Sequence, residues 1–187
     1  AAVDEFCRIL GDNETASDIA ATMHKALKNA NTYSDFVFSW VNALFCKYGL
    51  LVVNMDDKRL KEAFSHHMKE ELLEQKSYQP VRKVQDELIE LGYRPQAFVR
   101  EINLFYMGDG IRERISFENG NYRIHNTDKT FTAAEIEKEM EDNPDHFSPN
   151  VVMRPLYQEF ILPNLVYIGG GGELAYWMER KEQFRAF

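Results

Sequence analysis

The spacing of apolar residues predicts that most of the chain is helical. In the helical stretches, apolar side chains recur every three or four positions and therefore fall on one face of a helix. The stretch at residues 34–48 is the most apolar, and we expect Phe36, Trp40 and Phe45 in it to lie in the core. The predicted helices cover residues 3–10, 12–30, 34–48, 58–75, 80–91, 132–142, 155–162 and 173–187.

Two short apolar runs predict buried strands. Residues 50–54 read LLVVN and residues 164–168 read NLVYI, and both have the length and the β-branched side chains of strands. The first run follows a predicted helix at once, and a continuous apolar run is typical of a strand in a parallel sheet covered by helices. These runs predict a single α/β domain over residues 1–187, with parallel strands and flanking helices.

Residues 97–126 have a different pattern, because apolar and polar residues alternate along parts of them. Such alternation predicts strands with one buried face and one polar face, and Asn119-Gly120 is a strong hairpin signal. We therefore expect an antiparallel β-meander here, inserted in the α/β domain. Its polar face carries three arginines that we expect to be solvated: Arg112, Arg114 and Arg123.

Composition narrows the class of protein. A length of 187 residues is enough for one sizeable core, and a net charge of −8 argues against a nucleic-acid partner. Cys7 and Cys46 have neither metal-type spacing nor a disulfide framework, so we expect a reducing compartment and no metal. No apolar run reaches membrane-spanning length, so no membrane partner is expected. Because the chain begins without methionine and ends inside a helical pattern, we expect a fragment of a longer protein.

Residues 169–172 are four consecutive glycines between a predicted strand and the predicted helix that begins at Glu173. Glycine permits φ > 0 and has no side chain, so the backbone of such a turn can approach a ligand closely. The free N–H groups at the start of the helix are then suited to bind an anion. The glycines match neither a dinucleotide-binding motif nor a P-loop, so a flexible connection is the alternative.

Polar residues just before the glycines support a ligand site. Pro155 suits the first turn of a helix, and this helix places Arg154, Gln158 and Glu159 close together. A guanidinium, an amide and a carboxylate beside a glycine turn form a polar site, whereas the alternative is a few surface charges on a connection.

The stretch at residues 147–177, FSPNVVMRPLYQEFILPNLVYIGGGGELAYW, closely resembles the bacillithiol biosynthesis cysteine-adding enzymes, the cysteine ligase BshC family. The resemblance extends upstream through residues 103–106 (NLFY) and 49–54, and it covers nearly all of the chain from about Tyr33. Gly171 stands where the family usually has proline. The residues that match the family pattern are Asn150-Val151, Arg154-Pro155-Leu156, Gln158-Glu159, Leu162-Pro163, Gly170, Gly172-Glu173 and Tyr176-Trp177.

The resemblance implies a partial Rossmann-like three-layer domain from the middle of a longer enzyme. The family's N-terminal glycine and acidic motifs and its C-terminal coiled coil are not found in this sequence. The implied function is low-molecular-weight thiol synthesis in the cytoplasm, in which L-cysteine is joined to glucosaminyl malate by amide formation. The resemblance leaves the cofactor open, with ATP or another nucleotide as one alternative for activating the cysteine carboxyl group. A homodimer of the full-length protein is also compatible with it.

On this basis we expect a substrate pocket beside the glycine turn. Arg154 suits a substrate carboxylate through bidentate hydrogen bonds. Glu159 is the candidate general base, with an ion pair to Arg154 as the alternative. The substrate-binding residues that we expect are Arg154, Gln158, Asn150, Gly170, Gly171, Gly172, Glu173 and Tyr176. The competing hypothesis is a catalytically inert anion- or nucleotide-binding or assembly fragment of a Rossmann-like protein.

Overall fold

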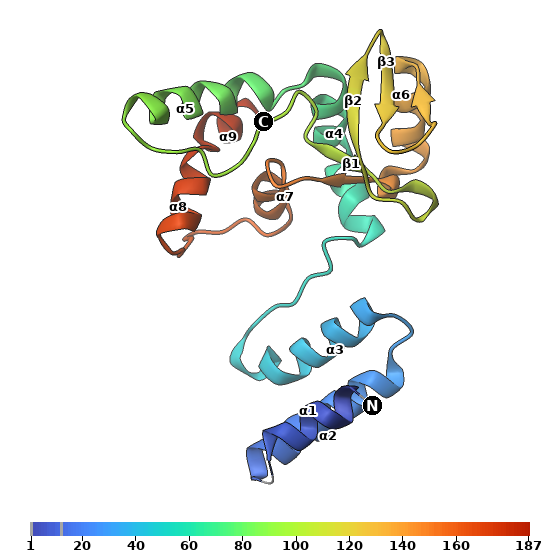
Figure 1. The fold of residues 1–187 in the computed structure, drawn as a ribbon, viewed down its shortest axis with the longest axis vertical. Helices are drawn as coiled ribbons and strands as arrows, with labels where there is room; N and C mark the ends of the chain where they lie inside the picture. The colour runs from blue at the N-terminus through green and yellow to red at the C-terminus, as the bar shows by residue number, and fades with distance from the viewer. Residues whose placement is uncertain (1, 12) are drawn as a thin grey trace. The chain divides into compact units, whose positions relative to one another are not determined.

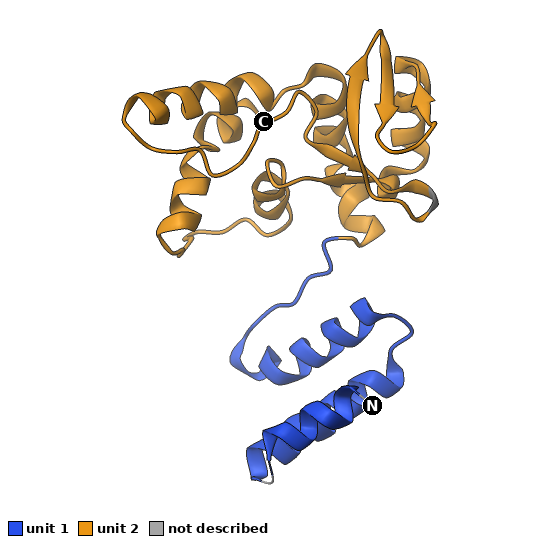
Figure 2. Ribbon diagram, in the orientation of Figure 1, with its two compact units in different colours: residues 1–55 blue, residues 56–187 orange. Residues whose placement is uncertain are grey.

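The computed structural model describes residues 2–11 and 13–187, without the side chain of Asp109. The chain divides into two compact units, residues 1–55 and residues 56–187 (Figure 2). We expected one α/β domain over residues 1–187, and that expectation stays a prediction.

The first unit is built from helices that begin at good capping residues. The side chain of Asn13 accepts a hydrogen bond from the backbone N–H of Ala16 at 2.9 Å, and Thr32 forms a capping box with Asp35. Asp12, where the sequence predicts the second helix to begin, lies outside the described residues. The elements are α1 (Ala2–Leu10), α2 (Glu14–Asn29), α3 (Tyr33–Phe45) and the 3₁₀ turn η1 (Cys46–Tyr48) (Figure 1).

Helix α3 is less buried than its sequence predicts. Phe36 stacks on Trp40 with 5.9 Å between ring centroids, and the ring of Phe6 meets Trp40 edge-on at 6.3 Å. Nevertheless no residue of α3 is buried, and Phe45 is 44% exposed. The prediction that Phe36, Trp40 and Phe45 lie in a core is therefore wrong for the described chain. A unit of 55 residues is too small to cover so many aromatic side chains.

The two expected parallel strands are absent, which corrects the predicted sheet. Residues 50–54 and 164–168 have no strand structure, and the strands of the described residues pair only in antiparallel fashion. A strand requires a neighbour that accepts and donates its backbone hydrogen bonds. Neither run has such a neighbour in the part of the chain that the structure describes. Their apolar side chains are exposed as a result, to 67% for Leu51 and 92% for Ile168.

The second unit combines helices with an antiparallel sheet. Its helix α4 is capped by Asp57, whose side chain accepts from the N–H of Arg59 at 2.9 Å. The short 3₁₀ turns are η2 (Gly108–Gly110) and η3 (Pro144–His146). The helices are α4 (Lys58–Glu74), α5 (Tyr78–Glu90), α6 (Ala133–Asp142), α7 (Arg154–Ile161), α8 (Gly171–Met178) and α9 (Lys181–Ala186).

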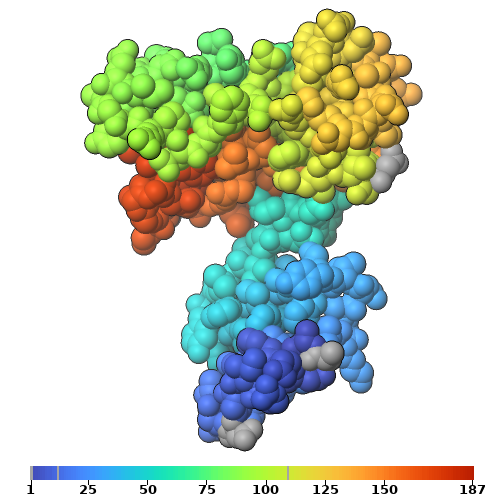
Figure 3. Space-filling view, viewed as in Figure 1, coloured from blue at the N-terminus to red at the C-terminus, as the bar shows by residue number. Residues whose placement is uncertain are grey.

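The helix predicted for residues 173–187 is divided into α8 and α9. Glu179 and Arg180 lie at the junction and are almost completely buried. Glu179 accepts hydrogen bonds from Gln85 Nε2 of α5 at 2.7 Å and from Arg180 Nη2 at 2.8 Å. These contacts turn the chain inward, so that α9 packs beside α5 (Figures 1 and 3).

The sheet has the strand order β4-β3-β2-β1-β5, and each neighbouring pair is antiparallel. Strands β1, β2 and β3 lie within residues 97–126, where we expected a meander. The Asn119-Gly120 turn between β2 and β3 has φ of 52° and 81°, as a type I′ hairpin requires. The strands are β1 (Leu104–Tyr106), β2 (Glu113–Glu118), β3 (Asn121–Ile124), β4 (Thr130–Phe131) and β5 (Phe147–Pro149).

One face of this sheet packs on α4 and α6 and forms the main core. Ile115 of β2 lies opposite Ile124 of β3, and their exposed fractions are 2% and 0%. Phe64 of α4 extends the core to α7, where its ring lies 4.9 Å from that of Tyr157. The opposite face carries the polar residues of the alternating pattern, including Arg114 and His125.

A buried carboxylate joins α4 to the segments around it. Glu71 is completely buried, and its Oε2 accepts from the N–H of Ser77 at 2.8 Å. Its Oε1 accepts from the backbone N–H and the Nδ2 of Asn103 at 2.9 Å and 2.8 Å. Burial raises the pKa of Glu71, although these donors oppose the shift. The start of α5 and the approach to β1 are thereby held by one side chain.

Candidate functional site

The predicted site begins at a turn that Asn150 forms. Its Oδ1 accepts from the N–H of Val152 at 2.7 Å and of Met153 at 3.3 Å, and its Nδ2 donates to Asn103 Oδ1 at 3.2 Å. This is an Asx turn, which delivers the chain into α7 at Arg154. The structure therefore gives Asn150 a positioning role, and its place among substrate-binding residues stays a prediction.

Arg154 is the centre of a polar cluster between α7 and α8. Its Nη1 donates to Gln158 Oε1 at 3.2 Å, and its Nη2 lies 3.7 Å from Glu173 Oε1. The guanidinium also lies over the ring of Tyr176, 5.9 Å from the ring centroid. The structure thus brings together four of the residues that the sequence predicts for the site: Arg154, Gln158, Glu173 and Tyr176.

Glu173 is held by two aromatic donors that the sequence-based set of site residues lacks. Tyr167 O–H donates to Glu173 Oε1 at 2.6 Å, and Trp177 Nε1 donates to the same oxygen at 3.0 Å. The Tyr167 bond is the main cause of the lowered pKa of Glu173, and Trp177 adds to it. The same bond raises the pKa of the Tyr167 phenol. An ionised Glu173 therefore stands beside the Arg154 guanidinium.

The glycine turn differs from its prediction in backbone conformation. The described glycines with positive φ are Gly11, Gly49, Gly92, Gly110 and Gly120, so residues 169–172 do not use the left-handed region. Instead the turn is extended at Gly170, with φ −70° and ψ 170°, and the helix begins with the next residue. A helix start requires ordinary negative φ, which explains the correction.

Only the first glycine of the run is in a tight position. A β-carbon on Gly169 would lie 3.1 Å from the Tyr167 ring and 3.2 Å from Glu173. A β-carbon on Gly170, Gly171 or Gly172 would meet no atom within 4 Å. The close approach in this turn is therefore between the chain and its own Tyr167–Glu173 contact.

The carboxylate of Glu159 contacts Asn164 and not Arg154. Its carboxylate accepts from the backbone N–H and the Nδ2 of Asn164, at 3.0 Å and 2.6 Å. It therefore fixes the turn after α7, while the carboxylate beside Arg154 is that of Glu173. The alternative role, an ion pair between Glu159 and Arg154, is replaced by these contacts, and the role of Glu159 as a general base stays a prediction.

An apolar cavity of about 640 Å³ lies next to this cluster, between α5 and α8. Tyr167 and Trp177 belong to both, because they line the cavity and also bind Glu173. None of the residues that the sequence predicts for the site lines it. Aromatic residues flanking a glycine run were the available signal for Tyr167 and Trp177. The other apolar residues of its wall are Val84, Leu88, Leu91, Leu174 and Met178.

The described residues contain neither a cluster of metal ligands nor a membrane-spanning helix. Across residues 2–11 and 13–187, no three His, Cys, Asp or Glu side chains gather in a way that would hold a metal ion. In the same residues, every helix is too short or too polar to cross a bilayer.

Comparison with known proteins gives the family. Residues 1–187 match a family model described as bacillithiol biosynthesis BshC, N-terminal Rossmann-like domain. Proteins named "Putative cysteine ligase BshC" are similar over nearly the whole chain. The similarity is 46% identity over 97% of the chain for Christiangramia forsetii, 45% over 98% for Flavobacterium johnsoniae and 32% over 97% for Bacillus cereus.

The chain spans 34% of the length of each of these three relatives. The resemblance inferred from the sequence is confirmed, whereas the placement in the middle of the enzyme stays a prediction. The chain belongs to the bacillithiol biosynthesis BshC family, within its N-terminal Rossmann-like domain.

Proposed function

We propose that this chain is part of a ligase that joins L-cysteine to glucosaminyl malate by amide formation, and that the Arg154 cluster binds a malyl carboxylate. Family membership supports the reaction class, and the observation that carries the site is the position of Arg154. Its guanidinium is 47% exposed and lies 3.7 Å from Glu173, beyond hydrogen-bond distance. Donors of the planar fork are therefore open to a carboxylate.

Neighbouring groups complete this carboxylate site. The first N–H groups of α8, at Gly171 and Gly172, have no acceptor within their own helix and favour an anion. Tyr167 and Trp177 hold Glu173, which limits its competition with the substrate for Arg154. Gln158 then suits a hydroxyl group of the sugar, whereas the Tyr176 hydroxyl donates to the Val151 carbonyl, and a substrate contact of Tyr176 stays a prediction.

The chemistry requires a neutral amine and an activated carboxyl group. Glu159 is the residue that we propose as general base, and ATP or another nucleotide is the co-substrate class that we expect for activation. No residue of this chain is assigned to nucleotide binding. We further propose a cytoplasmic location and a homodimer for the full-length enzyme.

A binding module without catalytic activity is the second candidate, and the short span of the match favours it for the chain alone. The chain covers 34% of the length of this relative from Christiangramia forsetii, and we expect further residues that the chemistry requires in the remaining length. Incubating the chain with cysteine, glucosaminyl malate and ATP separates the two. We expect mass spectrometry to show no condensed thiol, and product from this chain would exclude the inert module.

The carboxylate site is tested by Trp177 fluorescence during titration with glucosaminyl malate, in a Trp40→Phe background. Arg154→Lys keeps the charge and loses the fork, so we expect binding to weaken by about tenfold or more. Arg82→Lys is the matched control, because Arg82 pairs with Asp86 on the exposed side of α5. Equal affinity of Arg154→Lys and the parent, with unchanged thermal stability, would remove Arg154 from the site.

A further inference from the structure

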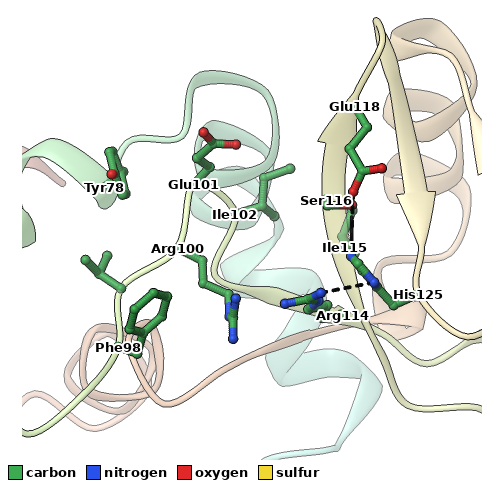
Figure 4. A pocket seen from close by; sticks show the side chains of 11 residues that line it. Tyr78, Phe98, Arg100, Glu101, Ile102, Arg114, Ile115, Ser116, Glu118 and His125 are labelled. Carbon is green, nitrogen blue, oxygen red and sulfur yellow. Dashed lines mark hydrogen bonds and ion pairs between the residues drawn. The ribbon is translucent and has the colours of Figure 1, made fainter.

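A second cavity, of about 330 Å³, lies on the polar face of the sheet (Figure 4). One wall comes from β2 and the start of the β3–β4 turn, and the other comes from residues 98–102, which precede β1. The residues of the proposed carboxylate site do not line it. The sequence predicts only a solvated face here, so this pocket is a separate feature that the proposed function does not use.

Two guanidinium groups face this cavity. Figure 4 shows the side chains of Arg100 and Arg114 in the same part of the pocket, away from Glu101 and Glu118. Arg100 lies over the ring of Phe98, 4.9 Å from its centroid. Among the side chains that the structure describes, neither arginine is paired with a carboxylate.

The pocket lining also includes the carboxylates of Glu101 and Glu118. Glu113 accepts from Asn126 Nδ2 at 3.0 Å, and Glu118 accepts from Ser116 Oγ at 2.7 Å. The lining thus carries two cationic and two anionic side chains, and Figure 4 shows the two guanidinium groups together and apart from the two carboxylates. Two like charges that share a pocket repel each other, and an anion between them removes that repulsion.

His125 fixes the orientation of Arg114. Arginine can only donate, so the 3.1 Å contact between Arg114 Nη2 and His125 Nδ1 makes Nδ1 the acceptor of a neutral imidazole. His125 Nε2 then carries the proton and donates to Ser116 Oγ at 3.0 Å. One nitrogen of the fork is thereby anchored, and its remaining donors are directed at the cavity.

The same tautomer indicates binding rather than covalent chemistry. A histidine that donates to Ser116 cannot at the same time accept its proton, so this pair is not arranged as a nucleophile and its base. Burial is the main cause of the lowered pKa of His125, and the charges of Arg114, Arg123 and Arg100 lower it further, while Glu118 opposes them. The lowered pKa agrees with a neutral imidazole that accepts from Arg114.

We propose that this pocket binds a small molecule that presents a phosphate or carboxylate group to Arg100 and Arg114. Its volume fits a ligand of small-molecule size. Tyr78, Phe98 and Ile102 form an apolar part of the lining, so the ligand also carries an apolar portion. This pocket is thus a second oxyanion site, distinct from the one at Arg154.

The NMR signal of the His125 imidazole provides a test. The variant His125→Gln lacks this signal and therefore assigns it. The chain is titrated with phenyl phosphate, benzoate and inorganic phosphate. We expect a saturable shift with one or both aromatic anions, and about tenfold weaker binding of inorganic phosphate, which lacks the apolar portion. The tighter aromatic anion identifies the acidic group. No saturable shift up to about 10 mM of any probe would overturn the proposal.

Variants separate this pocket from the carboxylate site. Arg100→Gln removes an exposed side chain without hydrogen-bond partners among the described residues, so the fold is retained, and we expect about ten- to a hundredfold weaker binding. Arg82→Gln and Arg154→Gln are the controls and are expected to leave the titration unchanged. Binding by Arg100→Gln with the parent's affinity, or its loss in Arg154→Gln, would contradict the proposal.

Discussion

Two stretches that both carry strand-forming side chains differ in structure in this molecule. The β2–β3 hairpin and residues 164–168 are both short and rich in β-branched and aromatic side chains. The hairpin is paired through an Asn119-Gly120 turn, and Ile124 in it is completely buried. Residues 164–168 have no strand structure, and Ile168 is 92% exposed. A turn brings the two strands of the hairpin together within a few residues, whereas no turn of this kind joins residues 164–168 to another strand among the described residues.

The largest expected difference between the two stretches comes from removing the same side chain in each. Ile124→Ala leaves a cavity in the core, and we expect unfolding by urea to show a loss of about 2–5 kcal/mol. Ile168→Ala is the matched change at an exposed position and should stay within about 0.5 kcal/mol of the parent. Similar losses for the two variants would show that residues 164–168 are buried in solution.

Two glutamates that hold backbone N–H groups extend the comparison to polar contacts. Glu71 is buried, and Gln at this position would turn an NH₂ group toward a donor, Ser77 N–H or Asn103. We expect Glu71→Gln to lower the free energy of unfolding by about 1–3 kcal/mol. Glu159 makes an equivalent contact to Asn164 in an exposed position. Glu159→Gln should therefore have little effect, and equal losses would mean that burial does not decide the contribution.

Two glycines give an effect of opposite sign. Gly120 has φ of 81° in the hairpin turn, so Gly120→Ala should destabilise the chain by about 1–2 kcal/mol. Gly171 is the first residue of α8, and the extended Gly170 before it is compatible with a following proline. Gly171→Pro should stabilise by about 0.4–1 kcal/mol, measured by thermal unfolding. Destabilisation by Gly171→Pro would show that this turn has another conformation in solution.

The smallest effect is a spectroscopic one at the carboxylate site. The Tyr167 and Trp177 hydrogen bonds lower the pKa of Glu173, so the contribution of this contact is present above the ordinary carboxyl pKa and is lost as the pH falls. In a Trp40→Phe background, Trp177 fluorescence should change with a midpoint below about pH 4.5. Glu173→Gln should remove this transition, and its persistence would assign the change to another group.

Local patterns carried most of the correct predictions. The hairpin at Asn119-Gly120 and the helix start at Pro155 each depend on residues within a few positions of one another. The clustering of Arg154 with Gln158 also follows from helical spacing, because the two lie one turn apart.

The remaining features depend on contacts distant in sequence. Tertiary structure is required for the pairing of Arg114 with His125 and for the pocket around Arg100. It is also required for the hydrogen bonds from Tyr167 and Trp177 to Glu173. Alternation along β2 and β3 predicts a polar face, but it cannot show that residues 98–102 form the opposite wall of a pocket. The missing parallel strands have the same cause, because no local signal identifies the partner of a strand.

The hydrogen bonds that the buried Glu71 carboxylate accepts have a consequence for the rate of amide hydrogen exchange. The amide protons of Ser77 and Asn103 belong to segments far apart in sequence, yet both are held by the same buried carboxylate. Neither proton can exchange with solvent deuterium until that carboxylate moves away. The two amides should therefore exchange slowly and at the same rate, so that they report the opening of α4, α5 and the approach to β1 as one cooperative event.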